Sequence, residues 1–240
     1  MFAYNISLLR TTLSEFLHKE SSAESFDWLI GQTITPQNIT RNFSLAGRKF
    51  IKQRPDHKPG QFIYLTGNFP QTSWGSWSIL DMARLYQLLQ LEIPGKQPYL
   101  DLIEALFLQA DLGELTVLYK ALPFHACPEA WTTRCAEGIR SNMGPVLEAI
   151  MYENSYPAEY LSEAAWNQMI LKAIFTGKDL HRIFGLQKRN NPALAASLLN
   201  YAEERWAAGR NVDMRLWELT TPLFPRETAI LKTKFLQQTS

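Results

Sequence analysis

Apolar residues recur at helical spacing along almost the whole chain, and this pattern constrains the fold more than any other feature. The first example is the set Ile6, Leu9, Leu13 and Phe16, which falls on one face of a helix. Strand-type alternation is almost absent. The short β-like run at residues 62–65 has no partner strand elsewhere, so we expect it to belong to a loop. The sequence therefore predicts an all-α protein.

The second half of the chain is regular enough for its helices to be counted. We predict them at residues 76–90, 98–109, 113–122, 128–141, 145–153, 162–176 and 192–208. Proline stands at or near the first turn of several, and Gly177 and Gly209 stand where a helix end favours a left-handed residue. Short connections such as 142–144 make neighbouring helices antiparallel. These helical hairpins predict either a HEAT-like α-solenoid or a compact multi-helix domain.

We interpret residues 1–240 as a single all-helical domain. A chain of 240 residues with 46% apolar content is long enough to bury roughly 70 to 75% of its unfolded surface. Prolines and glycines predict a long irregular loop at residues 52–77, and residues 226–240 fit a weakly anchored C-terminal helix.

Composition argues against several classes of protein. The chain has 24 Lys and Arg against 23 Asp and Glu, and a net charge of +1 provides no field that would attract nucleic acid. The uncharged stretch at residues 61–80 is broken by Gly67, Pro70 and Gly75, so we expect no membrane span. The N-terminal residues lack the pattern of a secretion signal, and the two cysteines are poorly placed for a disulfide. A cytoplasmic location follows as an expectation.

The predicted helix at 128–141 carries unusual polar residues. Glu137 lies three positions from both Arg134 and Arg140, and such pairs contribute only about 0.2 to 0.5 kcal/mol each when solvated. Gly138 costs about 1 kcal/mol in a helix relative to alanine, and close approach of another backbone or a ligand is the usual compensation. A surface ion network and a binding site, which would include Asn142, both remain open interpretations.

The predicted helix at 162–176 is apolar on most sides, which is typical of a buried element. Asn167 and Lys172 are therefore anomalous, because a buried polar group without a partner costs about 1 to 3 kcal/mol or more. Either a structural partner or a ligand would satisfy them. Trp166 and Trp206 offer stacking faces, and Arg205 precedes the second of these.

Metal and cofactor sites are not predicted. His125, Cys127 and Cys135 lie within eleven positions of one another, but a Cys-x-x-Cys pair and a fourth ligand are missing from this group. The 12 glycines are dispersed and form no phosphate-binding loop.

Three segments carry a resemblance to a known family: Ala-Glu-Gly-Ile-Arg-Ser-Asn at 136–142, Ala-Trp-Asn-Gln-Met-Ile-Leu-Lys-Ala-Ile-Phe at 165–175, and Tyr-Ala-Glu-Glu-Arg-Trp-Ala-Ala-Gly-Arg at 201–210. They resemble the EboA family of bacterial proteins. That family is associated with gene clusters that also encode a prenyltransferase-like membrane protein and barrel-type enzymes. The resemblance implies a part in trafficking or processing a secondary metabolite across the inner membrane, but it implies no particular chemistry.

The leading hypothesis is a non-catalytic, cytoplasmic helical-repeat protein that binds a small metabolite or a partner protein from the same gene cluster. Arginine offers a planar fork for a carboxylate or phosphate, and asparagine orients a polar ligand. The candidate binding residues are Arg134, Glu137, Arg140, Asn142, Trp166, Asn167, Lys172 and Arg205.

Two alternatives belong to other classes. In the first, the protein is an enzyme that acts on a metabolite precursor with Glu137 as acid or base. Two flanking arginines would favour the charged carboxylate and make it a poor proton donor near neutral pH. In the second, the protein is a DNA-binding helical solenoid, against which the near-zero net charge argues.

Overall fold

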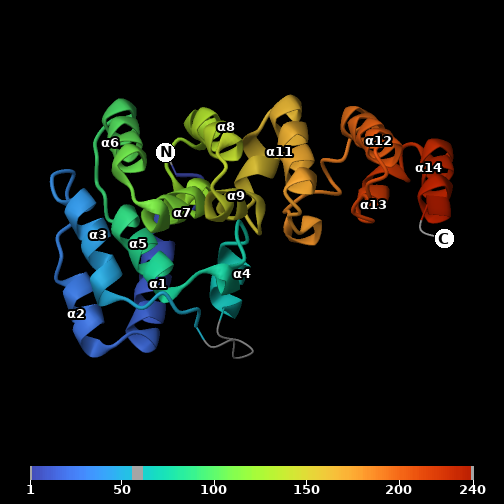
Figure 1. Cartoon of the computed structure of the whole chain (residues 1–240). Coiled ribbons are helices and arrows are strands. Elements are labelled where there is room, and N and C mark those ends of the chain that lie inside the picture. The colour runs from blue at the N-terminus through green and yellow to red at the C-terminus, as the bar shows by residue number, and fades with distance from the viewer. Residues whose placement is uncertain (1, 56–61, 239–240) are drawn as a thin grey trace. The chain divides into compact units, whose positions relative to one another are not determined.

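The computed structural model describes residues 2–55 and 62–238, and within these residues it contains helices and no strand (Figure 1). The prediction of an all-α, compact multi-helix protein is confirmed. The β-type pairing in the described residues is one isolated antiparallel bridge between Thr72 and Asn154. No helix in these two stretches combines the length and the apolar character that crossing a membrane requires.

The chain divides into two compact units, Met1–Tyr156 and Pro157–Ser240. The first contains α1 (Ile6–Glu20), α2 (Ala23–Ile30), α3 (Ile39–Lys49), α4 (Ile63–Asn68), η1 (Trp74–Ser76), α5 (Ile79–Leu89), α6 (Lys96–Gln109), α7 (Leu112–Lys120), η2 (Leu122–Phe124), η3 (Pro128–Trp131), α8 (Thr132–Arg140) and α9 (Gly144–Met151). After α10 (Tyr156–Tyr160), the second contains α11 (Glu163–Phe175), η4 (Leu180–Arg182), α12 (Pro192–Ala207), α13 (Leu216–Thr220) and α14 (Pro225–Gln238).

The seven helices predicted in the second half are present, with their ends shifted by up to a few residues. The predicted helix at 76–90 begins later, because Ser78 caps it by accepting a hydrogen bond from the Asp81 amide at 3.1 Å. The predicted helix at 128–141 is divided, since its first turn is the 3₁₀ helix η3 and α8 follows. Gly177 and Gly209 have φ angles of 64° and 65°, as a left-handed helix end requires.

Helix α5 is the core of the first unit. It packs against α1, α3 and α7, and every one of its residues except the half-buried Tyr86 is buried (Figure 1). Its polar residues are paired with neighbouring helices. Arg84 lies 3.5 Å from Glu114 of α7 and donates to the Phe43 carbonyl of α3, while Gln87 donates to the Asn42 carbonyl.

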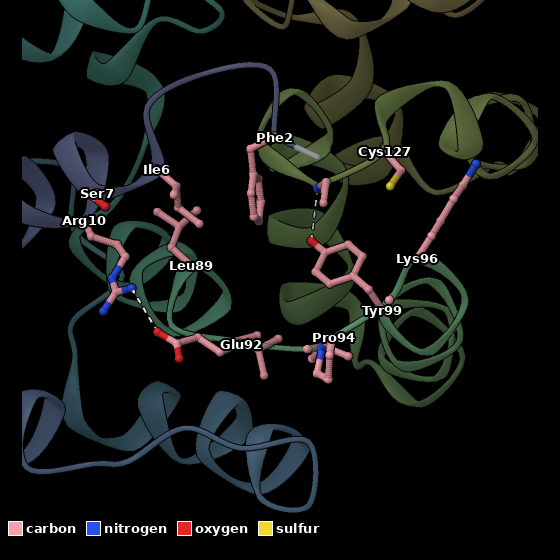
Figure 2. A pocket seen from close by; sticks show the side chains of 14 residues that line it. Phe2, Ile6, Ser7, Arg10, Leu89, Glu92, Pro94, Lys96, Tyr99 and Cys127 are labelled. Atoms are coloured by element: carbon pink, nitrogen blue, oxygen red, sulfur yellow. Dashed lines mark hydrogen bonds and ion pairs between the residues drawn. The ribbon is translucent and has the colours of Figure 1, made fainter.

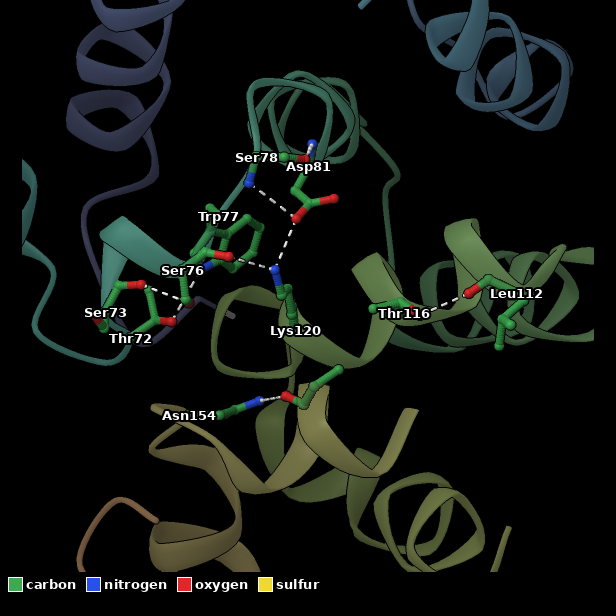
Figure 3. Close-up of polar contacts among 11 residues, drawn as sticks. Thr72, Ser73, Ser76, Trp77, Ser78, Asp81, Leu112, Thr116, Lys120 and Asn154 are labelled. Atoms are coloured by element: carbon green, nitrogen blue, oxygen red, sulfur yellow. Dashed lines mark hydrogen bonds and ion pairs between the residues drawn. The ribbon is translucent and has the colours of Figure 1, made fainter. Parts of the chain in front are cut away.

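A second set of polar contacts joins α5, α7 and the segment before α5 (Figure 3). The Lys120 ammonium contacts Asp81 at 2.8 Å and donates to the Ser76 carbonyl at 2.9 Å. The buried Asn154 side chain donates to the Tyr119 and Ala149 carbonyls, at the ends of α7 and α9. These bonds fix the irregular segments that connect the helices.

The segment at residues 52–77, expected to be a long irregular loop, contains short helices in its described part. Residues 62–65, expected to lie in a loop, contribute to the start of α4, where Leu65 is buried and Ile63 is exposed. Trp74 and Trp77 are fully buried against Phe124. Residues 56–61 of the expected loop lie outside the described residues.

In the second unit, α12 packs against α11, α13 and α14. Arg189 donates to the carbonyls of Pro157, Ala158 and Leu161, and so satisfies the C-terminal end of α10. The C-terminal helix, expected to be weakly anchored, buries Leu231 and Phe235, and the Phe235 ring contacts Trp217.

Gly138 lies where α8 approaches α7 and α9. A Cβ atom at this position would lie 2.5 Å from the Ile150 Cδ1 atom and 2.6 Å from the Tyr119 ring. Close packing by two side chains therefore explains this mid-helix glycine, and no ligand is needed to account for it.

We expect Gly138→Ala to lower the free energy of unfolding by about 1 to 3 kcal/mol, because the overpacking outweighs the gain in helix propensity. Gly67→Ala in α4 is the matched control, since nothing lies within 4 Å of an added Cβ there. Urea unfolding of both variants measures the difference. An unchanged stability for Gly138→Ala would contradict the packing explanation.

Candidate functional site

A groove of about 910 Å³ opens in the first unit, where α1 begins, α5 ends and α6 begins (Figure 2). Most of its lining is apolar and comes from these three helix ends, from the connection at residues 91–95, from the turn at residues 126–127 and from Phe2. The apolar side chains are Phe2, Ile6, Leu89, Leu91, Ile93, Pro94, Tyr99 and Ala126. A concave, mainly apolar site of this size, with a few polar groups, is typical of small-molecule binding.

The connection between α5 and α6 forms one wall of the groove. Leu91 is buried and anchors this connection, and the Pro94-Gly95 pair then turns the chain into α6. Gly95 has a φ of 93°, which other residues rarely adopt, so glycine is needed for the turn that places Lys96 at the mouth.

Tyr99 and Ala126 line the groove, and His125 lies behind them. The Tyr99 hydroxyl accepts a hydrogen bond from the Ala126 amide at 3.2 Å and lies 3.4 Å from His125 Nδ1. Burial lowers the pKa of His125 to about 4 and raises the pKa of Tyr99 well above its usual range. Both groups are therefore neutral at pH 7, and they place no charge beneath the groove.

Charged side chains lie at the two ends of the groove (Figure 2). Arg10 and Glu92 are at one end, with 3.8 Å between Nη1 and Oε1. Lys96 and Cys127 are at the other end in this view. Lys96 is exposed and forms no ion pair with any residue in the described parts of the chain.

The predicted site residues of the first unit lie on or just after α8. Arg134 donates to both carboxylate oxygens of Glu104 on α6, contacts Glu137 at 3.0 Å, and stacks over the Phe107 ring. The predicted pairing of Glu137 with Arg140 is not among the ion pairs of the described residues. Arg140 and Asn142 are exposed at the end of the helix.

The predicted site residues of the second unit have contacts within that unit. Asn167 exchanges two side-chain hydrogen bonds with Asn191, the residue that caps α12. Arg205 donates twice to the Asn211 carbonyl. Trp166 is fully buried beneath the Arg189 guanidinium, and Lys172 is half-buried in the last turn of α11.

Sequence reasoning missed the groove residues. Arg10, Lys96 and Tyr99 stand on helices with no unusual composition, so a motif search would not find them. The available signal was the apolar connection at residues 91–95, which ends in Pro-Gly directly before a lysine.

Metal binding finds no support in the described residues, which contain no group of three His, Cys, Asp or Glu side chains suited to hold an ion. Neither Cys127 nor Cys135 forms a disulfide within the described residues. Cys135 is buried in an apolar environment that raises its pKa, so it is inert as a nucleophile at pH 7.

Acidification should destabilise the fold through His125. The unfolded chain takes up a proton near the ordinary pKa of 6.5, whereas folded His125 does so only near 4. Stability is therefore retained above about pH 6.5 and falls by roughly 3 kcal/mol as the pH drops to about 4. We expect His125→Phe to remove this component of the slope, as measured by urea unfolding at several pH values. The exposed His181→Gln serves as control, and an unchanged slope in His125→Phe would contradict the assignment.

Comparison with known proteins assigns the family. A family model described as "Metabolite traffic protein EboA" matches residues 7–221, which is most of the 240-residue chain. No curated protein and no solved structure shows significant similarity to the chain. The matched region includes α5, α6 and the turn at 126–127, so it contains most of the groove lining. The chain belongs to the EboA family of metabolite traffic proteins.

Proposed function

We propose that this chain is a non-catalytic, cytoplasmic helical-repeat protein of a secondary-metabolite trafficking or export cluster, and that it holds a small metabolite in the groove between α1, α5 and α6. The observation that carries the proposal is the groove itself, which combines apolar walls with charged groups at its ends. Family membership supports the part in metabolite traffic.

The contacts of the predicted site residues divide them into two kinds. Arg134, Asn167 and Arg205 are engaged by Glu104, Asn191 and Asn211, which favours a role in holding the helices together. Arg140 and Asn142 are exposed, together with Met143. We propose that this end of α8 contacts a partner protein of the same cluster.

The enzyme alternative receives less support than binding. Glu137, the carboxylate considered as an acid or base, is ion-paired to Arg134 and does not line the groove. Tyr99, which does line it, is a neutral phenol whose pKa is raised by burial. A binding role requires neither group to transfer a proton.

Filling the groove tests the metabolite proposal. Ser7 is exposed and lines the groove, so Ser7→Trp would occupy part of the volume without disturbing the core. We expect this variant to lose the thermal shift and the mass adduct that a cluster metabolite gives with the wild type in a native mass-spectrometry screen. Thr11→Trp is the control, because Thr11 is exposed on the same helix and does not line the groove. Equal binding by both variants would place the ligand elsewhere.

Replacing Arg140 tests the partner proposal. Because Arg140 is exposed, we expect Arg140→Ala to change the free energy of unfolding by less than about 0.5 kcal/mol. We also expect weaker binding to proteins of the same cluster in a pull-down with each purified candidate. Arg48→Ala, an exposed arginine at the end of α3, is the control. A large thermal loss in Arg140→Ala, or undiminished partner binding, would remove Arg140 from the interface.

A further inference from the structure

The two ends of the groove differ in charge. At one end, Arg10 Nη1 lies 3.8 Å from Glu92 Oε1, so the positive and negative charges of this pair largely cancel. At the other end, Lys96 is exposed and has no carboxylate partner among the described residues. The groove is therefore electrically asymmetric, with a net positive charge at the Lys96 end.

The Lys96 end has a second feature that favours an anion. Lys96 is the first residue of α6, a helix of 14 residues whose N-cap is Gly95. No side chain caps this end, and no acidic residue lies in the first turn. The helix dipole and the amide groups of Lys96 and Gln97 add to the positive potential of the lysine, whereas Pro98 has no N–H to donate. These features would not define a site without the groove.

The rest of the groove suits an apolar body. Between the two ends lie Phe2, Ile6 and Leu89 (Figure 2). The Tyr99 phenol in the lining and the His125 imidazole behind it are neutral. A chain or ring system placed here is removed from water, which contributes about 25 cal/mol per Å² of apolar area.

We infer that the ligand of this groove is a soluble amphipathic anion whose carboxylate or phosphate head lies at Lys96 and the start of α6, and whose apolar body extends toward Arg10 and Glu92. This inference rests on the proposed binding function of the groove and names its ligand class. Carboxylate and phosphate share the required chemistry, because both accept charge-assisted hydrogen bonds from an ammonium and from amide groups.

Probes with one apolar chain and different heads test the ligand class. Decanoate, decyl phosphate, decanol and decyltrimethylammonium are titrated below their micelle concentrations into the full chain by isothermal titration calorimetry. We expect the two anions to bind at least about fivefold more tightly than the other probes. Lys96→Gln should weaken the anions about tenfold, or by about 1.4 kcal/mol, and leave decanol unchanged.

Arg10→Gln is the matched control at the other end of the groove, where Glu92 already offsets the charge. It should leave the preference for anions intact. Equal loss in Arg10→Gln and Lys96→Gln would overturn the assigned orientation. If decanol and the anions bind equally and Ser7→Trp still abolishes their binding, the ligand class is wrong. The proposed binding function of the groove is then still supported.

Two further outcomes are decisive. If Ser7→Trp affects none of the probes, or if no probe and no cluster metabolite binds, the proposed binding function itself fails. Co-sedimentation with phosphatidylglycerol vesicles separates a soluble ligand from a membrane lipid. Binding to vesicles that depends on Lys96, without binding of monomeric decyl phosphate, would overturn the soluble source.

Discussion

The first unit depends on the burial of one helix that is apolar on most sides but carries three polar side chains. Asp81, Arg84 and Gln87 of α5 each require a partner, and the partners come from α3 and α7. Removing one member of a buried ion pair typically costs about 3 to 5 kcal/mol. These contacts favour one rotation of α5 between its neighbours, whereas apolar packing alone would tolerate several.

This arrangement of α5 determines where the groove lies. Its last residue, Leu89, lines the groove, and the connection that follows continues along the wall to α6. The other wall begins with α1, which packs directly against α5. The opening thus combines the ends of three packed helices with the connection at residues 91–95 and the turn at 126–127, and the packed helices are the part that holds the surface most rigidly.

The helices could be predicted from sequence because their signals are local. Apolar spacing, prolines in the first turns, and Gly177 and Gly209 at helix ends are all visible within a few positions, whereas the cap at Ser78 was missed and that helix was predicted to start too early. The groove could not be predicted, because Ile6, Lys96 and Cys127 come from distant parts of the sequence and only tertiary packing brings them to one cavity. Asn167 was interpreted as a polar residue that needs a partner, and in the structure it pairs with Asn191. The sequence could not distinguish an internal partner, such as Asn191 for Asn167, from a ligand.

This distinction decides where binding is to be sought. A polar side chain on a buried helix is conspicuous in the sequence, but its desolvation has usually been compensated within the fold, as the Phe43 carbonyl and Glu114 do for Arg84 of α5. Such a group has little hydrogen-bonding capacity left for a ligand. An exposed lysine at the mouth of an apolar groove is inconspicuous in the sequence, and no carboxylate among the residues that the structure describes pairs with Lys96. Arg134 is already paired with Glu104, and a ligand would have to replace that carboxylate. Lys96 is exposed and has no ion-pair partner among the described residues, so we expect ligand recognition at Lys96.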